Sequence, residues 1–281
     1  MAKFEIPGTG WRPDVPDSRD YSPKTPQIKR LLAPLSVDDK SSRASKVDLR
    51  EYFPEVDHQQ RVNCSCAHAC IALVEYFQRL CYGHTTRLSH LFLYKTTRRV
   101  LGVTGNVSTD IRSTLNAMRS CGIPPERYWP YEETTINDEP DAFLYSFNDP
   151  YKSITYVRLD ATDKRGKKTL KTVKAFLAAG IPVAFGFSVP NSISQSGDIP
   201  YRPRFDGVYG GQAVVAVGYD DERLRESRGA LLIRNSWGGS WGEDGYGWLP
   251  YAYVTSLLAI DCWTILKSEW LESGGFTSAT L

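Results

Sequence analysis

The sequence predicts an α+β protein of two lobes with a cleft between them. Segments with helical spacing of apolar residues dominate the first half of the chain, and strand-like segments dominate the second half. Because the two kinds of segment are segregated rather than alternating, a helical lobe followed by an antiparallel sheet lobe is expected. A chain of 281 residues with 41% hydrophobic residues can bury a sizeable core in such an arrangement.

The composition divides the chain into three regions. Residues 1–45 form an N-terminal extension, and its prolines are expected to interrupt any helix or central strand: Pro7, Pro13, Pro16, Pro23 and Pro26. Two interpretations of this extension stay open, a loosely packed tail or a pro-segment-like strap over the cleft. Residues 46–272 form the two-lobed domain, with the helical lobe at about 46–150 and the β lobe at about 151–265, and residues 273–281 form a tail.

Three helices are predicted in the helical lobe. The first lies within Val47–Leu80, and its apolar residues fall on one face at helical spacing: Ala67, Cys70, Ile71, Val74 and Phe77. The second covers Leu88–Leu101. The third covers Ser108–Cys121, with a cap at Ser108 or Thr109 and an end at Gly122. Residues 125–150 are rich in aromatics and proline, which indicates a long ordered loop.

The second lobe is predicted to be mainly strands. Alternating or apolar segments of strand length occur at 153–160, 181–189, 210–221 and 230–238, and the glycine-rich segment 239–254 closes the sheet. One amphipathic helix is expected at 170–180, ended by Gly180.

Charge and hydropathy exclude several classes of function. The formal net charge is only +2, so no basic surface indicates binding to nucleic acid or to a membrane. Neither the N-terminus nor any later segment has the apolar run of a signal peptide or a membrane span. We therefore expect a cytoplasmic protein, in which the six cysteines are reduced.

A cluster of cysteines invites a metal-site interpretation. Cys64, Cys66 and Cys70 lie near His68, but their C-x-C-x3-C spacing is not one of the usual zinc patterns. Cys66 and Cys70 also share a helix face that is expected to be buried. The sequence therefore predicts core thiols, no metal and no cofactor.

Three segments together resemble the papain family of cysteine peptidases, in its bacterial form. The most specific is RNSWGGSWGEDGYG at residues 234–247, which matches the asparagine-serine-tryptophan-glycine motif of that family and its glycine-rich continuation. The segment GGQAVVAVGYDD at 210–221 resembles the strand that carries the family's histidine, and 57–76 resembles the approach to the nucleophile. The resemblance implies a papain-like fold, with a helical lobe facing an antiparallel sheet or barrel lobe across the active-site cleft.

The resemblance also implies a set of site residues. In this family a cysteine thiolate at a helix N-terminus attacks the carbonyl, a histidine returns the proton, and a glutamine helps to bind the oxyanion. Asn235 matches the asparagine that orients the histidine, and Trp237 matches the indole that shields it. The histidine position holds Gln212, whose amide has no titratable nitrogen near neutral pH.

The nucleophile position is ambiguous by one residue. An interval of six residues from glutamine to nucleophile fits both Gln59 with Ser65 and Gln60 with Cys66. The family places alanine two and four residues after the nucleophile, which Ala67 and Ala69 satisfy only for Ser65. The approach VDLREYFPEVDHQ also resembles bacterial relatives whose corresponding segment ends at the oxyanion glutamine. We therefore assign Ser65 and Gln59, with Cys66 and Gln60 as the second choice.

These substitutions predict a degenerate catalytic site. A serine needs a general base more than a cysteine does, because its hydroxyl stays protonated at neutral pH. The first hypothesis is an inactive peptidase homologue whose cleft binds a peptide or protein. A second is an active serine or thiol peptidase with an unusual base such as His68. A third is an engineered inactive form of a cysteine peptidase, which a single sequence does not distinguish from natural change.

Overall fold

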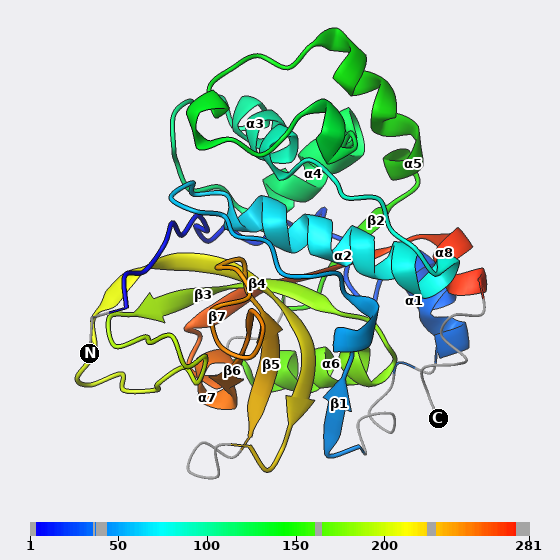
Figure 1. Ribbon diagram of the computed structural model, residues 1–281. Coiled ribbons are helices and arrows are strands. Elements are labelled where there is room, and N and C mark those ends of the chain that lie inside the picture. The colour runs from blue at the N-terminus through cyan, green and yellow to red at the C-terminus, as the bar shows by residue number, and fades with distance from the viewer. Residues whose placement is uncertain (1–3, 36, 38–43, 161–164, 224–228, 274–281) are drawn as a thin grey trace.

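The protein consists of a helical lobe and a sheet lobe that meet along one central helix. The computed structural model describes residues 4–35, 37, 44–160, 165–223 and 229–273. In Figure 1 the central helix α2 crosses the middle of the molecule, with the helical lobe above it and the sheet below it. The helices of the upper lobe and its centre are α2 (Ser65–Tyr82), α3 (His90–Val100), α4 (Ile111–Cys121) and α5 (Asp149–Lys152).

The lower lobe is built on a seven-stranded sheet in the order β2-β7-β3-β4-β5-β6, with β1 paired to β4. All of these strand pairings are antiparallel. The sheet stays open, so of the two predicted forms, sheet or barrel, it takes the first. The strands are β1 (Lys46–Asp48), β2 (Thr155–Arg158), β3 (Val183–Pro190), β4 (Val208–Asp220), β5 (Ala230–Arg234), β6 (Tyr246–Pro250) and β7 (Ala259–Leu266).

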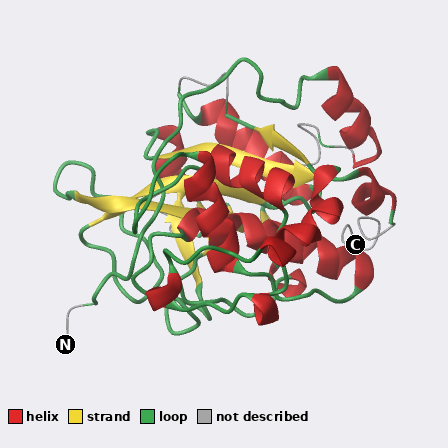
Figure 2. Ribbon diagram, turned by 90° about the horizontal axis from the view of Figure 1, so that it is seen from above, coloured by secondary structure: helices red, strands yellow, loops and turns green. Residues whose placement is uncertain are grey.

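Shorter helices surround these elements, and the view from above in Figure 2 shows helices crossing over the strands. Four of the remaining helices are α1 (Pro26–Leu32), α6 (Lys167–Ala178), α7 (Tyr251–Thr255) and α8 (Ser268–Glu272). Short 3-10 turns lie at Ala33–Leu35, Arg50–Tyr52, Glu126–Tyr128, Glu133–Thr135 and Ala142–Asn148. Among the described residues, no helix is both long and apolar enough to cross a membrane.

Helix α2 is buried on every side rather than on one face. All of its residues from Ser65 to Phe77 are buried, because the helix packs against β4 on one side and against α3 and α4 on the other. The sequence predicted an amphipathic helix, and this part of the prediction is wrong. The polar residues Ser65, His68 and Glu75 are placed in the interior together with the apolar face.

Several local features differ from the prediction for identifiable reasons. Helix α1 begins at Pro26 itself, because proline is well suited to the first turn of a helix, where its missing N–H is not needed. The cap of α4 is Asp110, whose side chain accepts a hydrogen bond from Ser113 N, rather than Ser108 or Thr109. The predicted loop at 125–150 contains 3-10 turns and α5. Strand β7 and helix α8 were not predicted, and of the predicted tail only residue 273 is among the described residues.

A buried arginine ties the N-terminal extension to the sheet lobe. The side chain of Arg158, in β2, is only 2% exposed and pairs with four carboxylates, three of them within 3 Å and that of Asp20 at 3.7 Å. Its guanidinium lies 2.7 Å from Asp14, 2.9 Å from Asp160 and 2.6 Å from Asp261. Because Asp14 belongs to the extension and Asp261 to β7, this cluster fixes the chain N-terminal to α1 against the sheet.

Replacing Arg158 should destabilise the protein strongly. The substitution Arg158→Met keeps much of the volume but leaves Asp160 and Asp261 without their cation, whereas Asp14 and Asp20 still pair with Arg112. Breaking comparable buried ion pairs costs about 3–5 kcal/mol. Urea denaturation followed by circular dichroism measures the free energy of unfolding. The control Arg19→Ala, which breaks an exposed pair with Asp17, should leave that free energy unchanged. Equal stability of the two variants would contradict the anchoring role.

Candidate active site

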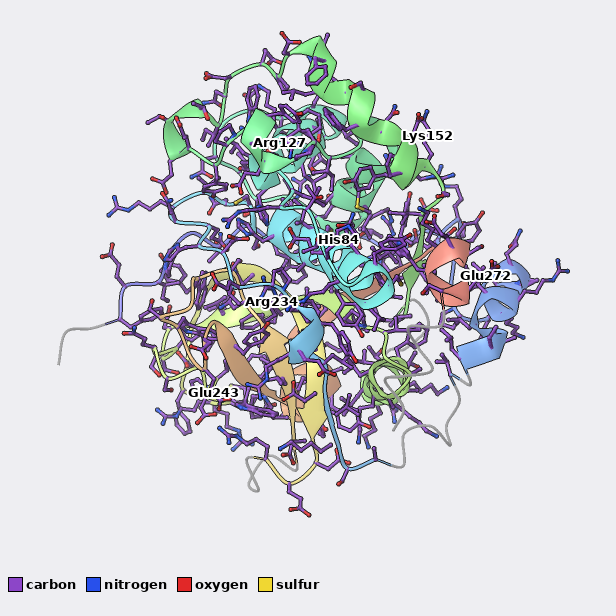
Figure 3. The ribbon with its side chains drawn as sticks, turned by 45° about the vertical axis from the view of Figure 1, so that its right-hand side comes forward. His84, Arg127, Lys152, Arg234, Glu243 and Glu272 are labelled. Carbon is purple, nitrogen blue, oxygen red and sulfur yellow. The ribbon has the colours of Figure 1, made fainter. Side chains whose placement is uncertain are left out.

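The four residues assigned to the site from sequence come together where α2 meets the sheet. Ser65 is the first residue of α2, and Gln59 lies in the loop that leads into it. Gln212 lies in β4, and Asn235 directly follows β5. All four side chains are buried, between 0% and 4% exposed. Figure 3 marks the neighbouring Arg234 near the centre of the molecule, whereas the labelled Lys152 lies at the edge of the helical lobe.

The amide of Gln212 is the centre of a hydrogen-bond network. Its Nε2 lies 2.8 Å from Gln59 Oε1, 2.9 Å from Asn235 Oδ1 and 3.1 Å from Ser236 Oγ. The Ser236 hydroxyl in turn donates to Gln59 Oε1 at 2.6 Å. The backbone supports the same contact, since Gln59 N donates to Ser236 O at 2.8 Å. The network thus joins the loop before α2 to the segment after β5.

This network holds side chains in place but offers no group that exchanges protons near neutral pH. A glutamine amide donates through its nitrogen and accepts through its oxygen, and neither atom acts as a general base. Gln212 Oε1 and Asn235 Nδ2 are buried and have no hydrogen-bond partner among the described residues. The arrangement can orient a bound group by hydrogen bonding, but it cannot accept a proton from a nucleophile.

Ser65 lies beside the strand that carries Gln212. Its Oγ accepts a hydrogen bond from Ala213 N at 3.0 Å. The hydroxyl is completely buried, and the position at the helix N-terminus favours negative charge there. His68, one turn further along α2, packs on other rings: it stacks on His90 at 4.0 Å and contacts the edge of Tyr131 at 5.7 Å.

Cys66 and Gln60, the second choice for the nucleophile and the oxyanion glutamine, lie elsewhere. The Cys66 thiol lies 3.5 Å from Thr109 O and 3.7 Å from Gly10 O, and burial raises its pKa well above the ordinary value. Gln60 is exposed and has a positive φ of 54°. The geometry therefore places Ser65 and Gln59, rather than Cys66 and Gln60, next to Gln212.

The N-terminal segment Gly8–Trp11 lies between the two lobes at this site. On the helical side, Gly8 N donates to Gln60 O at 2.7 Å and Thr109 N donates to Gly10 O at 2.9 Å. On the sheet side, Gly10 N and Trp11 N donate to Gly211 O at 3.0 and 2.9 Å. The indole of Trp237 also donates to Gly8 O at 3.1 Å. The segment is thus bonded to both walls through its backbone, as an extended peptide would be.

The side-chain amide of Gln59, the predicted oxyanion glutamine, is hydrogen-bonded to the carbonyl of Thr9. Gln59 Nε2 donates to Thr9 O at 2.5 Å and to Val62 O at 2.8 Å. The positions on either side of Thr9 require glycine, because a Cβ there would collide with the neighbouring backbone. A Cβ on Gly8 would lie 2.7 Å from Val62 O, and one on Gly10, which has φ +136°, would lie 2.3 Å from Asn63 C.

Trp11 anchors the segment on the sheet. Its ring lies directly over Gly186, where a Cβ would come within 1.9 Å of the ring. Its Nε1 donates to Asp261 Oδ2 at 3.2 Å, so the anchor joins the Arg158 cluster. The indole is 6% exposed, which makes it part of the core rather than of a mobile tail.

Sequence reasoning missed Thr9 and Ser236 as members of this site, and for Tyr131 it favoured packing within a long aromatic loop over lining a peptide groove. The hydroxyl of Tyr131 donates to Gln59 O at 2.7 Å and lies 3.1 Å from Cys64 Sγ. The pair of glycines around Thr9 was an available signal for close backbone approach. Nothing in the local sequence of Tyr131 distinguishes it from the other aromatics of its loop.

Comparison with known proteins gives consistent results. Residues 43–255 match the family model described as papain family cysteine protease. The structure of xylellain, a cysteine protease from Xylella fastidiosa, is similar with a TM-score of 0.77 and 32% identity, over 95% of this chain and 98% of that one. An uncharacterized peptidase C1-like protein of Acanthamoeba polyphaga mimivirus is 28% identical over 273 residues, which are 91% of this chain and 86% of its own. Procathepsin L2 from the Tenebrio molitor larval midgut, at 21% identity and a TM-score of 0.65, has a similar fold.

The burial of Cys66 predicts how the native thiols react. Alkylation requires the thiolate, and burial disfavours it. In native protein treated with iodoacetamide, the half-buried Cys81 and Cys121 should be modified well before Cys66, as peptide mass spectrometry would show. In urea all six cysteines should react alike. Rapid, selective modification of Cys66 in the native protein would instead support Cys66 as the residue at the nucleophile position.

Proposed function

Because this chain belongs to the papain family of cysteine proteases, we propose that it is a non-catalytic member that keeps the cleft of the family as a binding site for a peptide or protein segment. We also propose that it works in a reducing compartment such as the cytoplasm, where its cysteines, all free among the described residues, stay reduced. The first proposal depends on one observation, the amide of Gln212 at the centre of the site.

The Gln212 amide is an argument against catalysis because of what it bonds. Its nitrogen faces Asn235 Oδ1, the contact that the resemblance assigns to the histidine. In a catalytic member this partner orients an imidazole that takes and returns a proton. Here the same geometry holds a group without that capacity, and the nucleophile position carries a hydroxyl whose proton needs a base. Losing members of one catalytic unit lowers rates by roughly 10⁴–10⁶-fold in serine proteases.

Among the described residues, His68 is poorly suited to supply the missing base. The imidazole of His68 is the nearest candidate in sequence, but its ring contacts are with His90 and Tyr131. Burial lowers the pKa of His68 well below its usual value, and the neighbouring His90 lowers it further. A base with so low a pKa is a poor acceptor for the proton of a serine hydroxyl.

The segment Gly8–Trp11 supports a peptide as the ligand. It makes backbone hydrogen bonds to both lobes, and Gln59 binds its Thr9 carbonyl. We propose that this segment is a strap that fills the cleft in the resting protein. The close approach of the walls to Gly8 and Gly10 favours ligands with a glycine on each side of the residue that faces Gln59.

Restoring both catalytic groups should create a peptidase. We expect a triple variant to hydrolyse a fluorogenic peptide amide. It combines Ser65→Cys and Gln212→His, which restore the catalytic groups, with Gly10→Val, which displaces the strap. Neither change alone should give activity, because thiolate and imidazolium stabilise each other. The measurement is the initial rate with and without a peptidyl epoxide, which should abolish it.

The unmodified chain is the control and should stay at the background rate and unlabelled by the epoxide. Turnover by the unmodified chain that disappears in His68→Phe or Cys66→Ala would favour an active enzyme with altered catalytic residues. A triple variant that is folded but inactive would show that the walls of the cleft are not competent for hydrolysis.

Displacing the strap should open the cleft to added peptide. Any side chain at Gly10 collides with the backbone of Asn63, so Gly10→Val should expel the segment. A labelled peptide with the sequence of residues 4–14 should then bind at least about 10-fold more tightly than to the unmodified chain, because a tethered segment competes at millimolar effective concentration. Fluorescence polarisation measures this affinity.

A glycine outside the cleft provides the matched control. Nothing lies within 4 Å of a Cβ placed on Gly239, so Gly239→Val should leave peptide binding as weak as in the unmodified chain. Equal affinities of the Gly10 and Gly239 variants would rule out the strap as the occupant of a binding cleft.

A further inference from the structure

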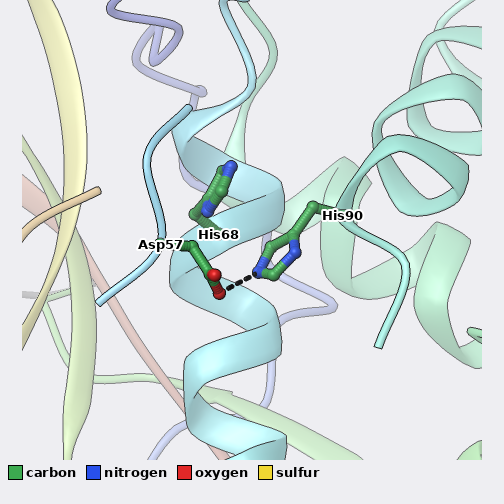
Figure 4. Close-up of side chains that lie close together, drawn as sticks. All are labelled: Asp57, His68 and His90. Carbon is green, nitrogen blue, oxygen red and sulfur yellow. Dashed lines mark ion pairs between the residues drawn. The ribbon is translucent and has the colours of Figure 1, made fainter. Parts of the chain in front are cut away.

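A group of buried polar residues lies close to the cleft and is not used by the proposed function. Figure 4 shows it: His68 projects from α2, His90 from the start of α3, and Asp57 from the loop before α2. One ligand atom from each residue lies within 4.8 Å of the others. The sequence prediction of no metal considered His68 only with nearby cysteines, whereas the fold places it beside Asp57 and His90.

The two imidazoles are packed face to face with a carboxylate at their edge. Their ring centroids are 4.0 Å apart with an angle of 21° between the planes. His90 Nε2 lies 3.7 Å from Asp57 Oδ2. Both histidines are buried, at 6% and 3% exposure for His68 and His90. Two stacked buried imidazoles beside a carboxylate are more than hydrophobic packing requires.

His68 Nε2 is the atom that apolar packing does not explain. It is buried and has no hydrogen-bond partner among the described residues. An unpaired polar atom in the interior is destabilising, since it loses its bond to water without replacement. The same residues line a cavity of about 10 Å³, together with Glu75 and Arg234. That space is sufficient for one ion or one water molecule.

We propose that Asp57, His68 and His90 bind a divalent transition-metal ion, with Zn²⁺ as the reference ion. Two imidazole nitrogens and one carboxylate oxygen are a ligand set that zinc and its neighbours prefer. Bonds of about 2.1 Å in tetrahedral geometry place ligand atoms about 3.4 Å apart. The present ligand atoms lie within 4.8 Å of one another, so they must move closer to bind an ion. His68 Nε2 has no hydrogen-bond partner to lose among the described residues.

Charged groups of both signs surround the cavity, with the acidic side chains of Asp57 and Glu75 and the guanidinium of Arg234 in its lining. Arg87 pairs with both Asp57 and Glu126, so its charge is balanced by two carboxylates. The guanidinium of Arg234 donates to the carbonyls of Pro54 and Glu55, at 2.8 and 2.7 Å, which fixes it to the loop. The Asp57 side chain is 17% exposed, which provides a route of entry from solvent.

A metal ion at this place would fasten three elements that meet beside the cleft. Asp57 is two residues before Gln59, whose amide binds Thr9. His68 is one turn after Ser65. The ion would therefore fix the loop that carries Gln59 to α2 and α3, and it would act on the shape of the cleft without contacting a peptide.

The test is titration of the full-length, chelator-treated protein with Co²⁺ and then Zn²⁺. We expect one equivalent of Co²⁺ to give visible d–d absorption without a thiolate charge-transfer band, because the ligands are nitrogen and oxygen. Zn²⁺ should displace it and raise the Tm. His68→Phe and His90→Phe keep the stacked rings but remove ligands, and each should weaken Co²⁺ binding at least about 100-fold, more than loss of an outer partner of a ligand.

The exposed His84, which lies outside the group, provides the matched control, and His84→Phe should bind Co²⁺ as the unmodified protein does. Circular dichroism identifies any variant that fails to fold, and Asp57→Asn provides a third, nearly isosteric variant. Three results would each overturn the proposal: no Co²⁺ binding by the unmodified protein, a thiolate band, or unchanged affinity in folded His68 and His90 variants. Because peptide binding is not measured, these outcomes are independent of the proposed function.

Discussion

The burial of α2 between the two lobes is the constraint on which the rest of the structure depends. From Ser65 to Phe77 the helix has no solvent-facing side, so each polar group that it brings into the junction is destabilising unless it is paired there. The hydrogen bonds among Gln59, Gln212 and Ser236 meet this requirement on the cleft side. These hydrogen bonds have a structural role, because they join the loop before α2 to the segment after β5. An apolar residue at position 212 would remove one hydrogen bond each from Gln59 Oε1 and Asn235 Oδ1, which would then be bonded only within the Ser236 segment.

Much of this architecture was predictable from sequence because it depends on long periodic segments. The central helix, the helices α3 and α4 and the strands β3, β4 and β5 follow from apolar spacing, and the positions of Gln212 and Asn235 follow from motifs that flank them. Features decided by single residues were not. A proline reads as a helix breaker although Pro26 begins one. The amphipathic interpretation of α2 failed because burial on the second side comes from α3 and α4, which are distant in sequence.

The contacts of Thr9 in the cleft and of His68 beside it could not be predicted from the local sequence. The position of Thr9 depends on the Arg158 cluster, which joins Asp14, Asp160 and Asp261 from separate parts of the chain. The group around His68 likewise forms only when α3 packs on α2. In both cases a polar residue acquires its partners from the tertiary fold, so its sequence neighbours, such as the cysteines beside His68, do not identify those partners.

The loop before α2 connects these two regions physically. Asp57 faces the imidazoles on one side, and Gln59 faces the strap on the other. Any ligand that fixes the loop in one position must alter the free energy of the other contact, and thermodynamic linkage makes the effect reciprocal. A peptide that replaces Thr9 at Gln59 and an ion bound by Asp57 would thus change each other's affinity by the same factor. Only His58 lies between Asp57 and Gln59 in the chain, so no longer pathway through the core is needed to couple the two contacts.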